Sequence, residues 1–372
     1  MREVNRKVPF FDYPRLYKDN KEDYLKIFDE VCSRGAFILQ KDVEDFEKNL
    51  AKYINSKFAI GVGNATDGLE IAWMAINLRN GDEVICCSHT MLATASAIKL
   101  SGGIPIPVEL GDDNLIDPNA VEAAITSRTV GIMPTQLNGR TCDMEKIMNI
   151  AEKYKLYVVE DAAQALGSKF KGKCAGTFGD AAAISFYPAK VLGSFGDAGG
   201  LITNKYDLYQ KMYQLHDHGR DQNGEQQSWG RNSRLDNLQA AFINYKFKSY
   251  DRVIKRRREI ASFYNDLLSD LDELILPPSP QNNSDHFDVY QNYEIQALRR
   301  NDLKEFLYKN GIGTLIQWGG KGIHQWEKLG FKKNLPKTDN FFKNCLMLPM
   351  NIFINNDDVF YICDQIEKFY RK

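Results

Sequence analysis

Six short apolar runs, separated by helical stretches, dominate the pattern from about residue 58 to residue 205. Runs this short and this continuously apolar are typical of strands buried on both faces, as in parallel sheets covered by helices. The sequence therefore predicts an α/β fold with a mostly parallel central sheet and helices on both faces. The expected strands are Phe58–Val62, Glu83–Cys87, Ile104–Val108, Val130–Pro134, Leu156–Glu160 and Ala181–Phe186, and the expected helices are Thr66–Leu78, Ala93–Leu100, Pro118–Ile125 and Asp143–Tyr154.

A second, smaller unit is expected after the central sheet, because 372 residues suggest about two domains. The polar stretch Arg220–Arg231 predicts a loop, and Leu235–Asp270 predicts one or two long helices. We expect a large domain over residues 1–250 and a smaller C-terminal α+β domain over 251–372. Beyond the proline-rich break at 277–280, the expected elements are a strand near Tyr290–Ala297 and helices at Asn301–Asn310 and Asp357–Tyr370.

Charge, cysteine content and hydropathy exclude several classes of protein. Lys and Arg number 48 against 49 Asp and Glu, which argues against a nucleic-acid partner. The basic run Lys255–Arg258 is interpreted as a solvated helix face, and the spacing of His216 and His218 does not suit a metal site, so no metal is expected. The N-terminus lacks an apolar segment, no run of about 18 apolar residues occurs, and the seven cysteines contain no CxxC pair. We expect a cytoplasmic protein with reduced thiols and no membrane partner.

Polar residues that follow the predicted strands are the place to look for a site, because ligands bind at the carboxyl ends of parallel strands. The first candidate is Gly61–Gly68, which runs from a strand into a helix. Small residues and a helix N-terminus suit a phosphate group. A Rossmann fingerprint is the rival reading, but Thr66 stands where its third glycine belongs. An ordinary strand-to-helix turn remains an alternative.

Two further candidates carry an acid and a lysine. Asp161 ends the run Val158–Asp161, where a carboxylate could keep a pyridine nitrogen protonated, although a helix N-cap is an equal alternative. Lys190 follows the strand that ends near Phe186 and precedes the small-residue loop Gly193–Gly200. Partial desolvation there would lower the pKa of the amine and make it nucleophilic. A lone lysine is normally a solvated surface charge, but the buried strand before Lys190 and the small-residue loop after it favour a functional role.

Together with the polar turn Gly230–Asp236, these segments resemble the DegT/DnrJ/StrS family of sugar aminotransferases. That family is a fold-type I branch of the pyridoxal 5'-phosphate (PLP) enzymes. The resemblance extends from about Val8 to the last helix, and its most specific part is Val158–Asn204. It implies a PLP cofactor and a homodimer with shared active sites.

The resemblance also implies a role for each of the matching residues. Lys190 would form the Schiff base with PLP, Asp161 would pair with the pyridine nitrogen, and Gln164 would lie near the ring hydroxyl. The phosphate group would be bound by Ala65, Thr66 and Ser185, with Asn232 contributed by the partner subunit. Met91 would lie against the cofactor ring, and His324 would lie near the sugar pocket.

Three segments depart from the usual pattern of the family. Met91 replaces an aromatic residue, although a methionine sulfur can also lie on a π face. Gln136 and Asn138 stand where relatives often carry His and Tyr, and the stretch Ile316–Lys321 replaces a tyrosine-proline segment. The last two departures bear on the identity of the substrate rather than on the Schiff base.

By this resemblance, an amino acid, with glutamate favoured, donates an amino group to a ketone on a nucleotide-linked 6-deoxyhexose. Carbon 4 is the preferred position, with carbon 3 as the alternative. A PLP-dependent sugar dehydratase is a rival, but related dehydratases tend to carry His where Lys190 stands. The incomplete glycine pattern argues against a nicotinamide enzyme. The full set of cofactor residues argues against a non-catalytic regulator.

Overall fold

A seven-stranded sheet lies at the centre of the computed structural model, which describes residues 6–281 and 285–371. One strand, β9, runs antiparallel to both of its neighbours, and the other neighbouring pairs are parallel. The six strands expected from the sequence are confirmed to within one residue at each end. In spatial order the strands are β1 (Phe58–Val62), β9 (Gly199–Thr203), β8 (Ala181–Ser185), β5 (Tyr157–Asp161), β4 (Thr129–Met133), β2 (Glu83–Cys87) and β3 (Ile104–Val108).

Strand β9 was not predicted, because its two glycines were assigned to the loop after Lys190. Only glycine fits at position 199, because a Cβ there would lie 2.5 Å from the carbonyl carbon of Asn64 and 2.7 Å from the nitrogen of Ala65. The glycine therefore lets the first turn of the following helix approach the sheet.

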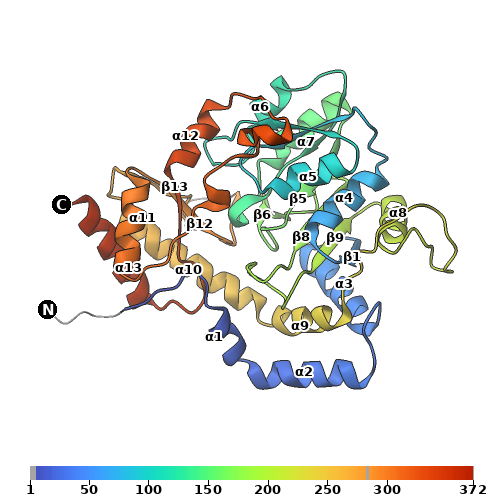
Figure 1. The fold of residues 1–372 in the computed structure, drawn as a ribbon, viewed down its shortest axis with the longest axis horizontal. Helices are drawn as coiled ribbons and strands as arrows, with labels where there is room; N and C mark the ends of the chain where they lie inside the picture. The colour runs from blue at the N-terminus through green and yellow to red at the C-terminus, as the bar shows by residue number, and fades with distance from the viewer. Residues whose placement is uncertain (1–5, 282–284, 372) are drawn as a thin grey trace.

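Helices cover both faces of the sheet, which makes three layers (Figure 1). Along β2, Val84 and Cys86 pack with the helices of one face, and Ile85 and Cys87 pack with those of the other. The predicted α/β fold is confirmed. The first face is covered by α4 (Ala65–Ala75), α5 (Leu92–Leu100) and α8 (Tyr206–His216), and the second by α3 (Lys41–Ile54), α6 (Pro118–Ala123), α7 (Met144–Tyr154) and α9 (Asn237–Phe247).

The N-terminal segment reaches both parts of the molecule. Val8 pairs with Ile312 and belongs to the hydrophobic core of the C-terminal part. The chain then forms α1 (Tyr13–Lys18) and α2 (Lys21–Ser33), which lie beside α9 below the sheet in Figure 1. These helices were not predicted from the sequence.

A three-stranded antiparallel sheet organises the C-terminal part. The strand expected at Tyr290–Ala297 begins later, because Tyr290 has a positive φ of 50° that is incompatible with a strand. The two helices expected here are confirmed within one residue, whereas α12 and β13 were not predicted. The elements are β10 (Leu274–Ile275), β12 (Tyr293–Ala297), β13 (Cys345–Leu348), α11 (Arg300–Lys309), α12 (Pro336–Asn344) and α13 (Asn356–Tyr370).

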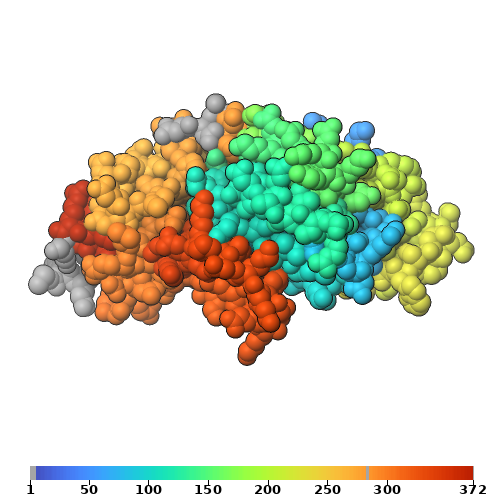
Figure 2. Space-filling view, turned by 90° about the horizontal axis from the view of Figure 1, so that it is seen from above, coloured from blue at the N-terminus to red at the C-terminus, as the bar shows by residue number. Residues whose placement is uncertain are grey.

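Helix α10 (Tyr250–Leu268) crosses from one core to the other. Tyr250 and Ile254 pack with the large sheet, whereas Tyr264 and Leu268 pack with the C-terminal sheet. The domain boundary expected at residue 250 stays a prediction. Figure 2 shows the orange-red part of the C-terminal unit lying against the teal part of the large unit. At this contact the Thr338 hydroxyl donates to Glu109 Oε2 at 2.5 Å.

The basic run on α10 is not a solvated helix face, so that interpretation is wrong. Arg257 is buried and donates to the backbone carbonyls of Tyr290 and Gln291. Arg256 and Arg258 are half-buried, and they too donate to backbone carbonyls of distant segments. Only Lys255 of this run is exposed. The arginines therefore tie α10 to the C-terminal part of the chain.

Within residues 6–281 and 285–371, no helix is both long and apolar enough to cross a bilayer. The same residues contain no cluster of three or more His, Cys, Asp or Glu side chains suited to a metal ion.

Candidate active site

Lys190 lies in a tight turn just beyond the carboxyl end of β8. Its backbone N–H donates to the carbonyl of Tyr187 at 2.8 Å. Gly193 allows the loop to fold back, because a Cβ there would lie 2.5 Å from the carbonyl oxygen of Pro188. Burial lowers the pKa of the Lys190 amine to about 8, and the negative charge of Asp161 opposes part of this lowering. The amine is therefore available in its neutral, nucleophilic form near pH 8.

Asp161 ends β5 and is 4% exposed. Its Oδ2 accepts a hydrogen bond from the Thr94 hydroxyl at 2.7 Å, and its Oδ1 accepts one from the Ala163 N–H at 3.2 Å. Burial raises the pKa of the Asp161 carboxyl, while these hydrogen bonds and the charge of Lys190 act in the opposite direction. Two donors leave lone pairs on a carboxylate, so it can still accept a ring N–H.

A chain of threonine hydroxyls supports Asp161, and sequence reasoning missed it. Thr94 gives its only proton to Asp161, so it must accept from Thr90, whose oxygen lies 2.7 Å away. Thr90 in turn accepts from Thr135 at 2.9 Å. These hydroxyls fix the direction of the carboxylate. The spacing of Thr90 and Thr94, four residues apart at a helix start, was the available signal.

The predicted phosphate-binding residues converge around the first turn of α4. Ser185 and Val62 are both register partners of Gly199, on opposite sides of β9. Ala65 and Thr66 follow Val62 closely and open α4, whose first N–H groups have no partners within the helix. The Asn64 side chain caps Asp67 N at 2.9 Å, which leaves the amides of the first two residues for an anion.

Gln164 and Met91 lie beyond the carboxyl ends of β5 and β2, which are separated in the sheet by β4. The Oε1 atom of Gln164 accepts from the backbone N–H of Asn138 at 2.9 Å. Met91 precedes α5 and is 53% exposed, unlike Thr90, which is buried. The Met91 side chain is therefore free to cover a ring bound at the end of the sheet.

Asn232 is exposed, and its Oδ1 accepts from Arg234 Nε at 3.1 Å. The next residue, Ser233, donates to Asp67 Oδ2 at 2.7 Å and accepts from Gly63 N at 3.1 Å. This turn therefore packs on the start of α4 in its own chain, with Asn232 directed to the surface. Whether Asn232 binds a phosphate stays a prediction.

His324 is held within the protein by both ring nitrogens. Nδ1 lies 2.5 Å from Ser88 Oγ, and Nε2 lies 3.0 Å from Asp339 Oδ1. Its side chain is 2% exposed. A direct hydrogen bond to a sugar would have to replace one of these partners, so the sugar-pocket role of His324 stays a prediction.

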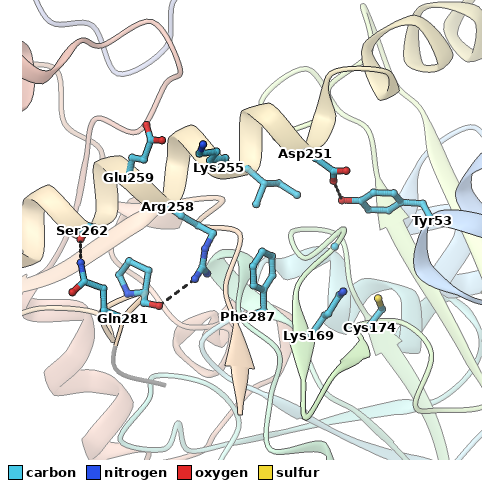
Figure 3. Close-up of a pocket in the computed structure, with 13 residues that line it drawn as sticks. Tyr53, Lys169, Cys174, Asp251, Lys255, Arg258, Glu259, Ser262, Gln281 and Phe287 are labelled. Atoms are coloured by element: carbon cyan, nitrogen blue, oxygen red, sulfur yellow. Dashed lines mark hydrogen bonds between the residues drawn. The ribbon is translucent and has the colours of Figure 1, made fainter. Parts of the chain in front are cut away.

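A separate cavity of about 640 Å³ lies between α10 and the small sheet of β6 (Lys169–Phe170), β7 (Lys173–Cys174) and β11 (His286–Phe287) (Figure 3). Its lining includes Tyr53, Lys169 and Arg258. The guanidinium carbon of Arg258 lies 4.2 Å from the centre of the Phe287 ring. None of the predicted cofactor residues lines this cavity.

Comparison with protein families decides the class of this site. Residues 18–367 match the model of the DegT/DnrJ/EryC1/StrS aminotransferase family. The chain belongs to this family. It is therefore a PLP-dependent aminotransferase, as the sequence predicted.

Relatives of this aminotransferase match over nearly its whole length. A Geobacillus stearothermophilus protein named "Pleiotropic regulatory protein" is 37% identical, covering 98% of this chain and 99% of the relative. A Streptomyces venezuelae protein named "dTDP-3-amino-3,4,6-trideoxy-alpha-D-glucose transaminase" is 31% identical, covering 98% and 96%. The solved structure of S. venezuelae DesV in complex with a ketimine intermediate has a TM-score of 0.94 at 31% identity, covering 98% of this chain and 99% of that one.

The residues of the aminotransferase fit PLP. A desolvated lysine amine suits a Schiff base, and a buried carboxylate with free lone pairs suits a protonated ring nitrogen. Gly199 lets the first turn of α4 approach the sheet beside Ser185, and the first amides of that helix suit a phosphate. The three features lie at one edge of the sheet, so a single cofactor could contact all of them.

Proposed function

We propose that this aminotransferase moves an amino group from an amino acid, glutamate in our proposal, to a ketone on a nucleotide-linked sugar. The observation that carries the proposal is the desolvated amine of Lys190 beside the buried carboxylate of Asp161. The family to which the chain belongs supports the same reaction class.

Bound PLP supplies an electron sink for the carbon that carries the amino group. In our proposal Lys190 Nζ holds the cofactor between reactions and, once released, carries a proton from the Cα of the donor. Its pKa of about 8 suits both tasks, because an efficient acid–base group titrates near the operating pH. Asp161 keeps the ring nitrogen protonated, and the threonine hydroxyls hold its carboxylate in place.

For the acceptor we propose a 3-keto sugar linked to a nucleoside diphosphate. The name of the S. venezuelae relative contains a sugar with its amino group on carbon 3, and this relative matches 98% of the chain. The sequence alone favoured carbon 4, and a 4-keto sugar is therefore the other outcome that the test must resolve.

The test loads the enzyme with pyridoxamine phosphate and adds one acceptor at a time. We expect a 3-keto nucleotide sugar to restore the visible absorbance of PLP and to yield an amino sugar detectable by mass spectrometry. A 4-keto sugar tests the other carbon, and the corresponding sugar without a ketone is the control. Restoration by 2-oxoglutarate with no response to either keto sugar would contradict the proposed acceptor class.

We further propose that the active unit is a homodimer. Large apolar side chains remain exposed in segments of the candidate site, at Met91 (53%) and Tyr187 (52%), and Trp229 in the preceding part of the Asn232 segment is 94% exposed. Leu25 and Phe28 on α2 are also about half exposed. Exposed large apolar side chains favour an interface, and a second copy would use each contact twice. Asn232, three residues after Trp229, would then reach the phosphate in the partner's site.

Mixed dimers test the shared site. We expect Lys190→Ala and Asn232→Glu subunits each to be inactive alone, because the second change sets a negative charge against the phosphate. Exchanged subunits should recover activity, since each hybrid contains one site with both native residues.

The matched control for the mixed dimers is Asn223→Glu, a change at another exposed asparagine in the loop that precedes Asn232, which should keep its own activity. Hybrids verified by native mass spectrometry that remain inactive would refute the shared site.

A further inference from the structure

A buried polar cluster joins the C-terminal sheet to the loop after β4. Its centre is Glu294 of β12, whose side chain is 2% exposed. Glu294 Oε2 accepts from Asn138 Nδ2 at 2.7 Å and from Gln317 Nε2 at 3.1 Å. Gln317 also donates to Asn138 Oδ1 at 2.6 Å. Two segments that depart from the usual family pattern, those of Asn138 and Gln317, therefore meet at one carboxylate.

His89 lies next to this carboxylate. Its Nδ1 lies 2.8 Å from the carbonyl oxygen of Asn114, which can only accept, so Nδ1 carries a hydrogen. Its Nε2 lies 3.3 Å from Glu294 Oε2, and both side chains are buried. The hydrogen bonds from Asn138 and Gln317 offset part of the cost of burying the carboxylate.

The cluster reaches the cofactor site through Asn138. The Asn138 backbone N–H donates to Gln164 Oε1 at 2.9 Å. Asn292 Nδ2 lies 3.5 Å from the same oxygen. Since a carbonyl oxygen accepts these contacts, the amide nitrogen of Gln164 must point the other way. Within the described part of the chain, that nitrogen donates to no protein oxygen and is left for a ligand.

We propose that Glu294 is a positioning residue, which with His89 fixes Asn138 and thereby directs the Gln164 amide nitrogen at the hydroxyl oxygen of the cofactor ring. This inference rests on the proposed function, because it assumes that Gln164 lies beside that oxygen. A donated N–H would lower the basicity of the ring oxygen of bound PLP and, through it, that of the Lys190 nitrogen joined to the cofactor. The pH at which the visible absorbance of the bound cofactor changes is therefore sensitive to the direction of Gln164.

Glu294→Gln replaces the carboxylate, which accepts from both Asn138 and Gln317, by a neutral amide that accepts less strongly. We expect the variant to bind PLP and to show a midpoint of the absorbance change that is higher by about one pH unit. Gln164→Ala should raise the midpoint in the same direction. Because Glu294 acts through Gln164, the double variant should shift no further than Gln164→Ala alone.

The matched control is Glu83→Gln. Glu83 is also a buried glutamate, 3% exposed and paired with Arg128, but it begins β2 at the opposite edge of the sheet. Its variant should keep the wild-type midpoint even if it is less stable. If Glu294→Gln keeps the wild-type midpoint while Gln164→Ala shifts it, the inference about Glu294 is overturned and the proposed function still stands. Absence of any cofactor absorbance in the wild-type protein would overturn the proposed function and this inference with it.

Discussion

Lys190→Ala is expected to lower kcat by about 10⁴-fold or more, because the change removes both the covalent attachment of PLP and the proton carrier. Non-covalent contacts remain at Asp161 and at the first turn of α4, so the variant should still bind pyridoxamine phosphate. Steady-state turnover measures the first effect, and equilibrium binding of pyridoxamine phosphate measures the second.

A matched control for this variant is Lys99→Ala, which changes an exposed lysine on α5. It should keep wild-type turnover. Substantial steady-state activity in Lys190→Ala would contradict the role assigned to this lysine, whatever the behaviour of the control.

Asp161→Asn should lower the rate of transamination by about 10²–10³-fold while cofactor content falls much less. A neutral amide cannot hold the ring nitrogen protonated as strongly as a carboxylate, so the electron sink is weakened. The phosphate site and Lys190 are untouched, and they retain the cofactor. The ratio of single-turnover rate to bound PLP measures the effect, and a near-native rate at normal cofactor content would refute the role.

The central sheet was predictable because its strands are short, apolar and buried on both faces. Strand β9 was not predicted because Gly199 and Gly200 are typical of a loop, although the following Leu201 and Ile202 continue an apolar run. Helix α3 also carried a readable signal, since its core residues Val43, Phe46, Leu50 and Ile54 recur at helical spacing. In contrast, α12 is short and largely polar, so its pattern carries little information.

The candidate site was predictable only where it follows directly from strand order. Asp161 and the Lys190 turn follow neighbouring parallel strands, β5 and β8, so the topology brings them together. The partners of Glu294 could not be inferred, because His89, Asn138 and Gln317 come from three distant segments. The arginines of α10 were misread for the same reason, since their carbonyl partners lie 22 or more residues away.

The most direct test of the account is to reduce the purified enzyme with borohydride and map the modified peptide by mass spectrometry. Reduction fixes a Schiff base as a stable secondary amine on the lysine that carried it. The account predicts loss of the visible absorbance and a pyridoxyl group on Lys190. A pyridoxyl group on any other lysine, or no covalent label in a protein that contains bound PLP, would contradict it.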